Sequence, residues 1–442
     1  MMGKPSTNRG NWLELVAICA LLVVIVVALA ISSGAISLSR QAPSASLTSP
    51  AEENVSAPTT PPVPSSTPAA EPSGNPSTLT IVSTGDILPH LSVNHFARQA
   101  DGTLDYARLW DPVAPYIQNA DLALCALEVP IVPPGEKPSN YPMFGAPPEL
   151  ISSLQKFGFD GCALATNHSM DRGFAGIKST IDNLAGADLG WAGTARSEQE
   201  AQEIQFYTLR AGNRDVKIAH LSATMLTNGM PYPREGSWAW NVVGELGERS
   251  VDDIIDEARR ARALGADLVV LNMHWGVEYV SQPPEDVVGV AQQLADSGEI
   301  DAVFGGHSHV PQPVAKLEGG PDGNGMWVAY SAGNFISGQT VENHGCRVVA
   351  GVVNTATVEV PAEGPARVTK MDWTAVTQDT STYHIWPLHL LREGQRPAGL
   401  AMGEDAINCR IDATYPVMET EGSTEKVEPP ARVADSVSLT RE

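Results

Sequence analysis

Basic side chains are scarce in this sequence. Lys and Arg together number 28, against 51 Asp and Glu, and the formal net charge at pH 7 is −23. A protein that binds nucleic acid needs a basic footprint, so this balance argues against a nucleic-acid partner. The same surplus of acid disfavours docking on an anionic membrane surface through charge.

Cysteine is scarce as well, and five residues are too few for a disulfide framework. Cys19 lies in the apolar N-terminal segment. Cys125 and Cys162 lie in apolar runs, where we expect free thiols that pack as small hydrophobic side chains. Cys346 and Cys409 are expected to pair if the domain lies in an oxidising compartment.

Charged residues are missing from residues 15–31, which are rich in Leu, Val, Ile and Ala. About 20 apolar residues span a bilayer, so we expect residues 12–33 to form a transmembrane anchor. Residues 1–10 carry Lys4 and Arg9 and no acid, which predicts that residues 1–11 stay in the cytoplasm and that the rest is exported. A cleaved signal peptide ending near residues 28–30 is the alternative. Both alternatives predict an extracytoplasmic C-terminal domain, and the anchor would make it a single-pass protein of the cell membrane.

Large apolar residues are rare in residues 34–78, which consist mainly of Pro, Ser, Thr and Ala. Such a composition cannot form a core and predicts a disordered linker. We expect one domain over residues 79–372, an extension at 373–418 that packs on it, and a disordered acidic tail at 419–442.

From Leu79 onward, short β-rich runs alternate with amphipathic helical segments, which predicts an α/β fold. The expected helices are residues 148–157, 176–185, 251–264 and 285–297. The expected strands are residues 79–83, 122–127, 161–165, 217–222, 268–273, 303–306 and 327–331.

Polar residues follow the ends of six of these strands. In α/β sheets the carboxyl edge is where ligands bind, so their clustering there predicts a site. Each residue alone has a plainer alternative as a helix cap, a turn residue or a buried histidine. Gly305 and Gly306 would let the backbone approach the site closely. Carboxylates, an amide and imidazoles together suit Mn, Fe or Zn better than Ca or Mg. The polar residues that follow these strand ends are Asp86, Glu128, Asn167, His168, His274, His307, His309 and Asn334.

Six short motifs, given in chain order at the end of this paragraph, together resemble those of the CapA family. This family consists of poly-γ-glutamate capsule biosynthesis proteins and is related to calcineurin-like metallophosphoesterases. The resemblance extends from Leu79 to about Phe335 and implies a calcineurin-like four-layer αββα sandwich. The motifs are Gly85-Asp86, Leu127-Glu128, Asn167-His168-Ser169-Met170-Asp171-Arg172-Gly173, His274-Trp275-Gly276-Val277-Glu278-Tyr279, Gly306-His307-Ser308-His309-Val310-Pro311-Gln312 and Tyr330-Ser331-Ala332-Gly333-Asn334-Phe335.

The resemblance also implies a cofactor of two divalent metal ions, which activate water and clamp a phosphoryl group. The implied ligands are Asp86 and His309 for one ion, Asn167, His274 and His307 for the other, and Glu128 as a bridge.

Four further roles follow from the same resemblance. His168 would donate a proton to the leaving group, and Asp171 would orient the Asn167-His168 turn. Glu278 and Asn334 would line the substrate pocket.

The motifs depart from the family pattern at three positions. Leu88 stands where a His is usual, with His90 the next histidine, and Ala126 and Thr166 stand where Asn is usual. The resemblance therefore leaves two functions open. The first is a phosphoester hydrolase of capsule or exopolymer biosynthesis, and the second is a non-catalytic anchored scaffold that binds or exports a cell-wall polymer. The expected partners are the membrane, capsule-synthesis membrane proteins, and an anionic cell-surface polymer or a phosphoester substrate.

Overall fold

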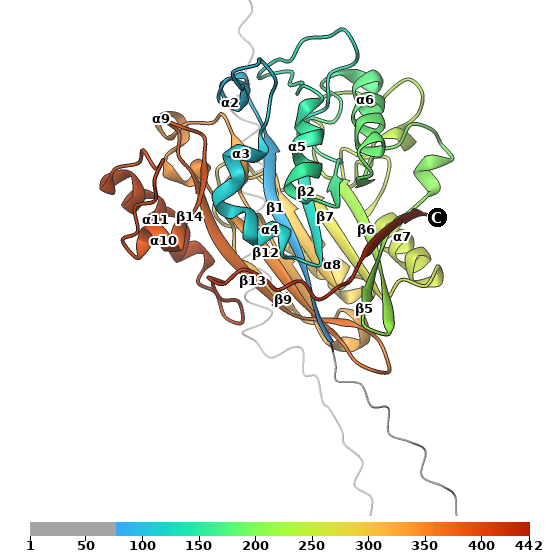
Figure 1. Ribbon diagram of the computed structural model, residues 1–442. Helices are drawn as coiled ribbons and strands as arrows, with labels where there is room; N and C mark the ends of the chain where they lie inside the picture. The colour runs from blue at the N-terminus through green and yellow to red at the C-terminus, as the bar shows by residue number, and fades with distance from the viewer. Residues whose placement is uncertain (1–76) are drawn as a thin grey trace, which may run out of the picture. The chain divides into compact units, whose positions relative to one another are not determined.

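Two β-sheets form the centre of the fold in the computed structural model, which describes residues 77–442 (Figure 1). The predicted cytoplasmic segment, the predicted anchor and residues 34–76 of the predicted linker lie outside the described residues. Between residues 77 and 442, no helix is both long enough and apolar enough to cross a membrane.

The larger sheet has eight strands and is mixed. Its central strand β1 (Ser77–Leu88) pairs in parallel with β2 (Leu122–Leu127) and antiparallel with β12 (Ala350–Val360). β1 continues past Asp86, although the sequence predicts an end before that residue. The other strands are β3 (Gly161–Ala163), β4 (Gly190–Ala192), β11 (Asn334–Ser337), β13 (Arg367–Gln378) and β14 (Ile385–Pro387).

The second sheet has seven strands, with a parallel centre and antiparallel edges. Its strand β7 is buried along its whole length. This is the pattern of a parallel strand covered on both faces. The strands are β5 (Gln205–Ala211), β6 (Arg214–Thr224), β7 (Leu268–His274), β8 (Ala302–Gly306), β9 (Val314–Leu317), β10 (Met326–Ala329) and β15 (Val437–Arg441).

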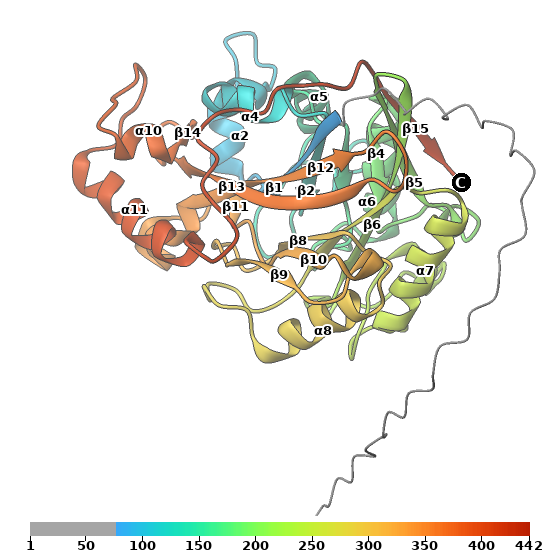
Figure 2. The ribbon, with the colours of Figure 1, turned by 90° about the horizontal axis from the view of Figure 1, so that it is seen from below.

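The two sheets stack face to face, and helices cover their outer faces (Figure 2). Successive side chains of a strand point to opposite faces of its sheet, so neighbouring residues pack in different layers. On β2, Leu122 and Leu124 pack between the sheets, whereas Ala123 and Cys125 pack toward the helices. The order of layers is therefore helix, sheet, sheet, helix, as the predicted αββα arrangement requires.

Helices α5 (Glu149–Phe157) and α6 (Gly173–Gly186) cover the larger sheet, and α7 (Val251–Ala263) and α8 (Glu285–Asp296) cover the other. All four expected helices are thus present. Ser250 caps the N-terminus of α7 and forms a reciprocal capping box with Asp253. The remaining helices are α2 (Leu91–Ala97), α3 (Ala107–Trp110), α4 (Ala114–Gln118), α9 (Val341–His344), α10 (Leu388–Arg392) and α11 (Glu404–Met418).

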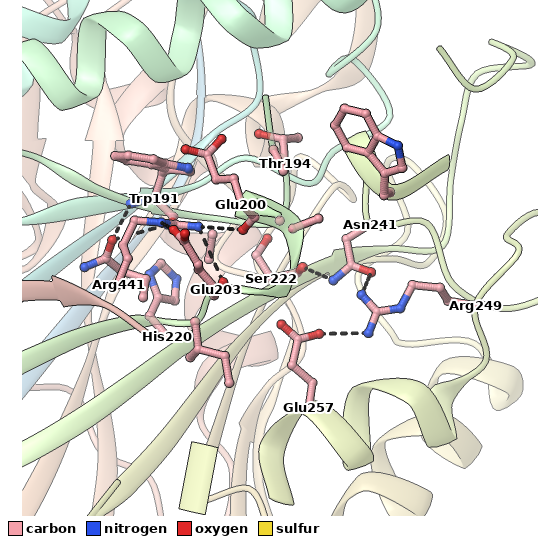
Figure 3. A pocket seen from close by; sticks show the side chains of 17 residues that line it. Trp191, Thr194, Glu200, Glu203, His220, Ser222, Asn241, Arg249, Glu257 and Arg441 are labelled. Carbon is pink, nitrogen blue, oxygen red and sulfur yellow. Dashed lines mark hydrogen bonds and ion pairs between the residues drawn. The ribbon is translucent and has the colours of Figure 1, made fainter. Parts of the chain in front are cut away.

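The C-terminal residues form part of the second sheet, so the prediction of a disordered tail is wrong for Val437–Arg441. This strand, β15, pairs antiparallel with β5. The Arg441 guanidinium lies 4.3 Å from the centre of the Trp191 ring and donates to the Trp191 carbonyl at 2.8 Å (Figure 3). The predicted boundary at residues 372–373 falls inside β13, because this strand runs on to Gln378.

Four cysteines form two disulfides, Cys125–Cys162 and Cys346–Cys409. The first corrects the expectation of two free thiols. Cys125 and Cys162 are register partners on the adjacent parallel strands β2 and β3, and both are fully buried. The second confirms the expected pair and ties the segment after α9 to α11.

We expect Cys409→Ser to lower the free energy of unfolding by about 4 kcal/mol, on the chain-entropy account of disulfides. The reason is that a sequence separation of 63 residues is no longer closed by a cross-link in the unfolded chain. Urea unfolding of the two proteins would measure the difference. The double variant Cys346→Ser/Cys409→Ser is the control and should show the same loss; an unchanged midpoint would contradict the expectation.

Candidate metal centre

Seven polar side chains converge where strands of both sheets end or bend. The larger sheet supplies four of them and the second sheet three, so they come from the carboxyl ends of two stacked sheets and not from one edge. β1 has register irregularities on both of its parallel pairings next to Asp86, and such bulges re-aim side chains. The seven, each at most 5 % exposed, are Asp86, Glu128, Asn167, His168, His274, His307 and His309.

Asp86, Glu128 and His309 form the first group that could hold a metal ion. The Nδ1 atom of His309 lies 3.3 Å from Oδ2 of Asp86 and 3.7 Å from Oε2 of Glu128. Two oxygens and one nitrogen therefore point at one position.

Glu128, His274 and His307 form the second group. The Nε2 atom of His274 lies 3.4 Å from Oε1 of Glu128 and 2.9 Å from Oδ1 of Asn167. Glu128 belongs to both groups, with one carboxylate oxygen directed at each. This is the arrangement that a bridging carboxylate between two ions requires.

Glu128 provides the test of whether the residues fit a metal. Its side chain is fully buried, yet neither carboxylate oxygen has a well-formed hydrogen bond within residues 77–442. Burial would raise its pKa, but His309 and His274 outweigh burial and lower the pKa to about 2. Buried carboxylate oxygens that lack donors are costly, and a divalent cation bound by each group would satisfy both of them. The residues present therefore fit a divalent cation.

The loop after β8 holds its two histidines in unusual backbone conformations. His307 has φ +92° and His309 has φ +58°, a region that residues other than glycine rarely adopt. Such strain clusters at functional sites. A Cβ atom on Gly306 would lie 2.5 Å from Oδ1 of Asp86, and the His307 amide donates to Oδ2 of Asp86 at 3.1 Å. The close backbone approach predicted for this glycine is confirmed.

His168 lies beside both groups but belongs to neither. Its Nδ1 is 2.8 Å from Oδ2 of Asp171, which also accepts the Phe144 amide at 2.6 Å. Burial lowers the pKa of His168, but Asp171 and Glu128 together raise it above the ordinary value. The second nitrogen, Nε2, has no carboxylate partner within the described residues. His168 can therefore carry a proton next to the metal groups.

The two residues predicted to line a substrate pocket lie in different surroundings. Glu278 is exposed, in the loop after β7. Asn334 is 5 % exposed and begins β11, with its Oδ1 3.1 Å from Nδ1 of His309. Only Glu278 is open to a molecule arriving from solvent.

The family of this chain follows from its similarity to known protein families. The profile of the family described as bacterial capsule synthesis protein PGA_cap matches residues 80–339, which is more than half of the chain. The chain belongs to this family. The matched residues include every one of the seven convergent side chains.

Relatives of this chain share about a quarter of the aligned residues. The capsule biosynthesis protein CapA of Bacillus anthracis is 28% identical over 270 residues, covering 59% of this chain and 60% of the relative. A probable polyglutamine synthesis accessory protein of Mycobacterium tuberculosis is 26% identical over 302 residues, covering 60% of this chain and 75% of the relative. The chain thus spans about three fifths of the length of the first of these relatives.

Among solved structures, a calcineurin-like phosphoesterase from Bacillus subtilis, YfkN, is similar with a TM-score of 0.42. It is 15% identical, and the similarity covers 77% of this chain and 98% of that one.

Position 88, where the family pattern has a histidine, is taken by a buried leucine. Leu88 is 1 % exposed and packs in the apolar core between the larger sheet and its helices. His90 does not take its place as a ligand in either group: its Nδ1 lies 3.0 Å from the Leu88 carbonyl and accepts the Gly338 amide at 2.9 Å. Position 88 therefore supplies no donor atom.

Two residues near the centre were not predicted. Asn228 contacts Asn167 at 3.2 Å and Nε2 of His168 at 3.4 Å, and it lies in an exposed loop after β6. Tyr279 places its ring 5.9 Å from the His309 ring and stacks on His344 at 4.0 Å. Both have positive φ. The Asn228-Gly229 pair is a turn signal, but nothing in it indicates which site the turn reaches.

A polar cavity beside β4 and β6 is separate from this centre. Figure 3 shows its two clusters of charged side chains, with Arg441 and Glu203 on one side and Arg249 and Glu257 on the other. These pairs form ion contacts of 3.4 Å and 2.8 Å. None of the seven convergent residues lines the cavity. Both arginines that line this cavity are therefore paired with carboxylates.

Proposed function

We propose that this chain is a metal-dependent hydrolase of the phosphoester type, anchored in the cell membrane with its C-terminal domain outside. The single observation that carries the hydrolase proposal is Glu128, a fully buried carboxylate that belongs to both groups of potential ligands and whose oxygens have no well-formed hydrogen bond within residues 77–442. Two divalent ions of Mn, Fe or Zn would satisfy it.

The proposed ligands fall into two sets, one for each ion. Asp86 and His309 would hold one ion, Asn167, His274 and His307 the other, and Glu128 both. When bound, the ions supply Lewis-acid activation of water and neutralise charge on a phosphoryl group.

His168 would act on the leaving group. The Asp171 carboxylate accepts from its Nδ1, which leaves Nε2 as the nitrogen that can deliver a proton. Asp171 and Glu128 raise the pKa of His168 above its ordinary value, which favours the protonated form that a general acid requires. Asp171 is thus a positioning residue, which fixes the ring and favours its charged form.

The biological substrate we propose is a phosphoester of capsule or exopolymer biosynthesis at the cell surface. The proposal is supported by the family match and by the names of the relatives, one of capsule biosynthesis and one of polyglutamine synthesis. The net charge of −23 would repel a long polyanion such as poly-γ-glutamate. It therefore favours a small phosphoester over the polymer itself as the group bound at the centre.

Metal content and hydrolysis measured together test this function. The chain, purified without chelator, should carry about two ions and hydrolyse bis(4-nitrophenyl) phosphate when Mn²⁺ is added. His274→Ala and His309→Ala should each lower the metal content, whereas His95→Ala, which changes an exposed histidine, should not. One ion without turnover would favour the scaffold function, and the absence of any ion would refute the metal centre.

A further inference from the structure

We propose that Asn334 is a metal ligand, and that its Oδ1 is the fourth protein donor at the position surrounded by Asp86, Glu128 and His309. The inference rests on the metal centre proposed above and assigns as a ligand a residue that the family resemblance implies only for the substrate pocket. It gives Asn334 a place in the centre instead of the substrate-lining role first expected.

Distances between donor atoms support a shared ion. Two atoms bound to one ion at about 2.1 Å lie about 3.0 Å apart at a right angle and about 3.4 Å apart at a tetrahedral angle. The Nδ1 atom of His309 is 3.1 Å from Oδ1 of Asn334 and 3.3 Å from Oδ2 of Asp86. The distance from His309 to the Asn334 oxygen is thus close to its distance from the Asp86 carboxylate, which the proposed centre already uses as a ligand.

The orientation of the amide is fixed by its other end. Nδ2 of Asn334 lies 2.8 Å from Oε1 of Gln339 and 2.8 Å from the Val348 carbonyl oxygen. The Val348 carbonyl can only accept, so the NH₂ group must face it. The oxygen is therefore the atom that faces the centre, and only an oxygen in this position could bind a cation.

The backbone brings Asn334 to this place. Asn334 is the register partner of Asp86, on the adjacent parallel strands β11 and β1. A Cβ atom on Gly85 would lie 2.0 Å from the Gly333 carbonyl oxygen, so the two chains can approach only because residue 85 is glycine. The Asp86 amide then donates to that carbonyl at 2.8 Å. One strand pair thus delivers a carboxylate and an amide oxygen side by side.

Proton counting also favours a cation over a simple hydrogen bond. Three oxygens surround Nδ1 of His309, one each from Asp86, Glu128 and Asn334. A single N–H can serve only one of them well, and neither Glu128 oxygen has a well-formed hydrogen bond within residues 77–442. A cation at the shared position would satisfy all four atoms at once.

The experiment must separate a ligand from a residue that only positions His309, because loss of such a partner also weakens metal binding by about 10–100-fold. Asn334→Cys separates the two cases. A thiolate bound directly to Co²⁺ gives a charge-transfer band in the near ultraviolet, and a thiol farther away gives none. Gln339→Cys is the matched control, since Gln339 lies one hydrogen bond farther out.

With Co²⁺ added to the full chain, we expect the band in Asn334→Cys and not in Gln339→Cys. Asn334→Asp should retain two ions, whereas Asn334→Leu should bind one of them at least 10-fold more weakly. Absence of the band in an Asn334→Cys protein with a native far-ultraviolet spectrum would overturn the assignment, whatever the affinities. If the unaltered chain bound no metal, the proposed function itself would fail, so the two failures are distinguishable.

Discussion

Replacing His168 with alanine is expected to lower kcat by about 10²–10⁴-fold, the usual contribution of general acid catalysis, while both metal ions are retained. His168 lies outside both potential ligand groups, so its loss should not release metal. Because Nδ1 donates to Asp171, Nε2 is the nitrogen of His168 that can deliver a proton, and Asp171 and Glu128 raise the pKa of the ring above its ordinary value.

The choice of leaving group tests whether this loss reflects proton donation. An alkyl phosphodiester needs a proton on its departing oxygen, whereas a 4-nitrophenyl ester departs as a stable anion. His168→Ala should therefore impair the alkyl ester far more. Asp171→Asn is the matched control, because it keeps the shape but removes the charge that raises the His168 pKa. It should move the alkaline limb of the pH–rate profile to lower pH. Equal losses with both substrates would rule out the acid role.

The elements and the location of the centre can largely be predicted from the sequence. β2 and α7 follow directly from apolar runs, capping residues and charge at the helix ends. Residues such as Glu128 and His274 directly follow or end buried parallel strands, and this placement alone indicates a common site. What the local pattern cannot give is that two stacked sheets, and not one, supply the donors.

Features that depend on long-range pairing are not predicted. β15 is a short polar strand that exists because β5 offers it a free edge, more than 200 positions away in the chain. The Cys125–Cys162 bond depends on the register of β2 and β3, which composition does not reveal. Asn334 can be recognised as near the centre, but its pairing with Asp86 requires β11, whose four residues are too few to predict.

The affinity for the metal is expected to rise about tenfold per pH unit between pH 6 and pH 9, and to level off above that. His309 must lose a proton before Nδ1 can bind a cation. Burial would lower its pKa, but the charges of Glu128 and Asp86 outweigh burial and raise it to about 9. Below pH 9 the ion therefore competes with a proton. His307 adds no such competition, because burial, together with His274 and His309, keeps its pKa well below the ordinary value.

Calorimetric titration with Mn²⁺ in buffers of different ionisation enthalpy would measure the protons released. We expect release of about one proton per chain at pH 7 and little above pH 9. The apparent dissociation constant should fall about 10³-fold from pH 6 to pH 9, as one competing proton predicts. Because Asp171 lies outside both ligand groups, Asp171→Asn should give the same pH dependence and serves as the control. A dissociation constant that did not change over this range would mean that His309 is already neutral, and hence that Glu128 and Asp86 do not act on it as their distances indicate.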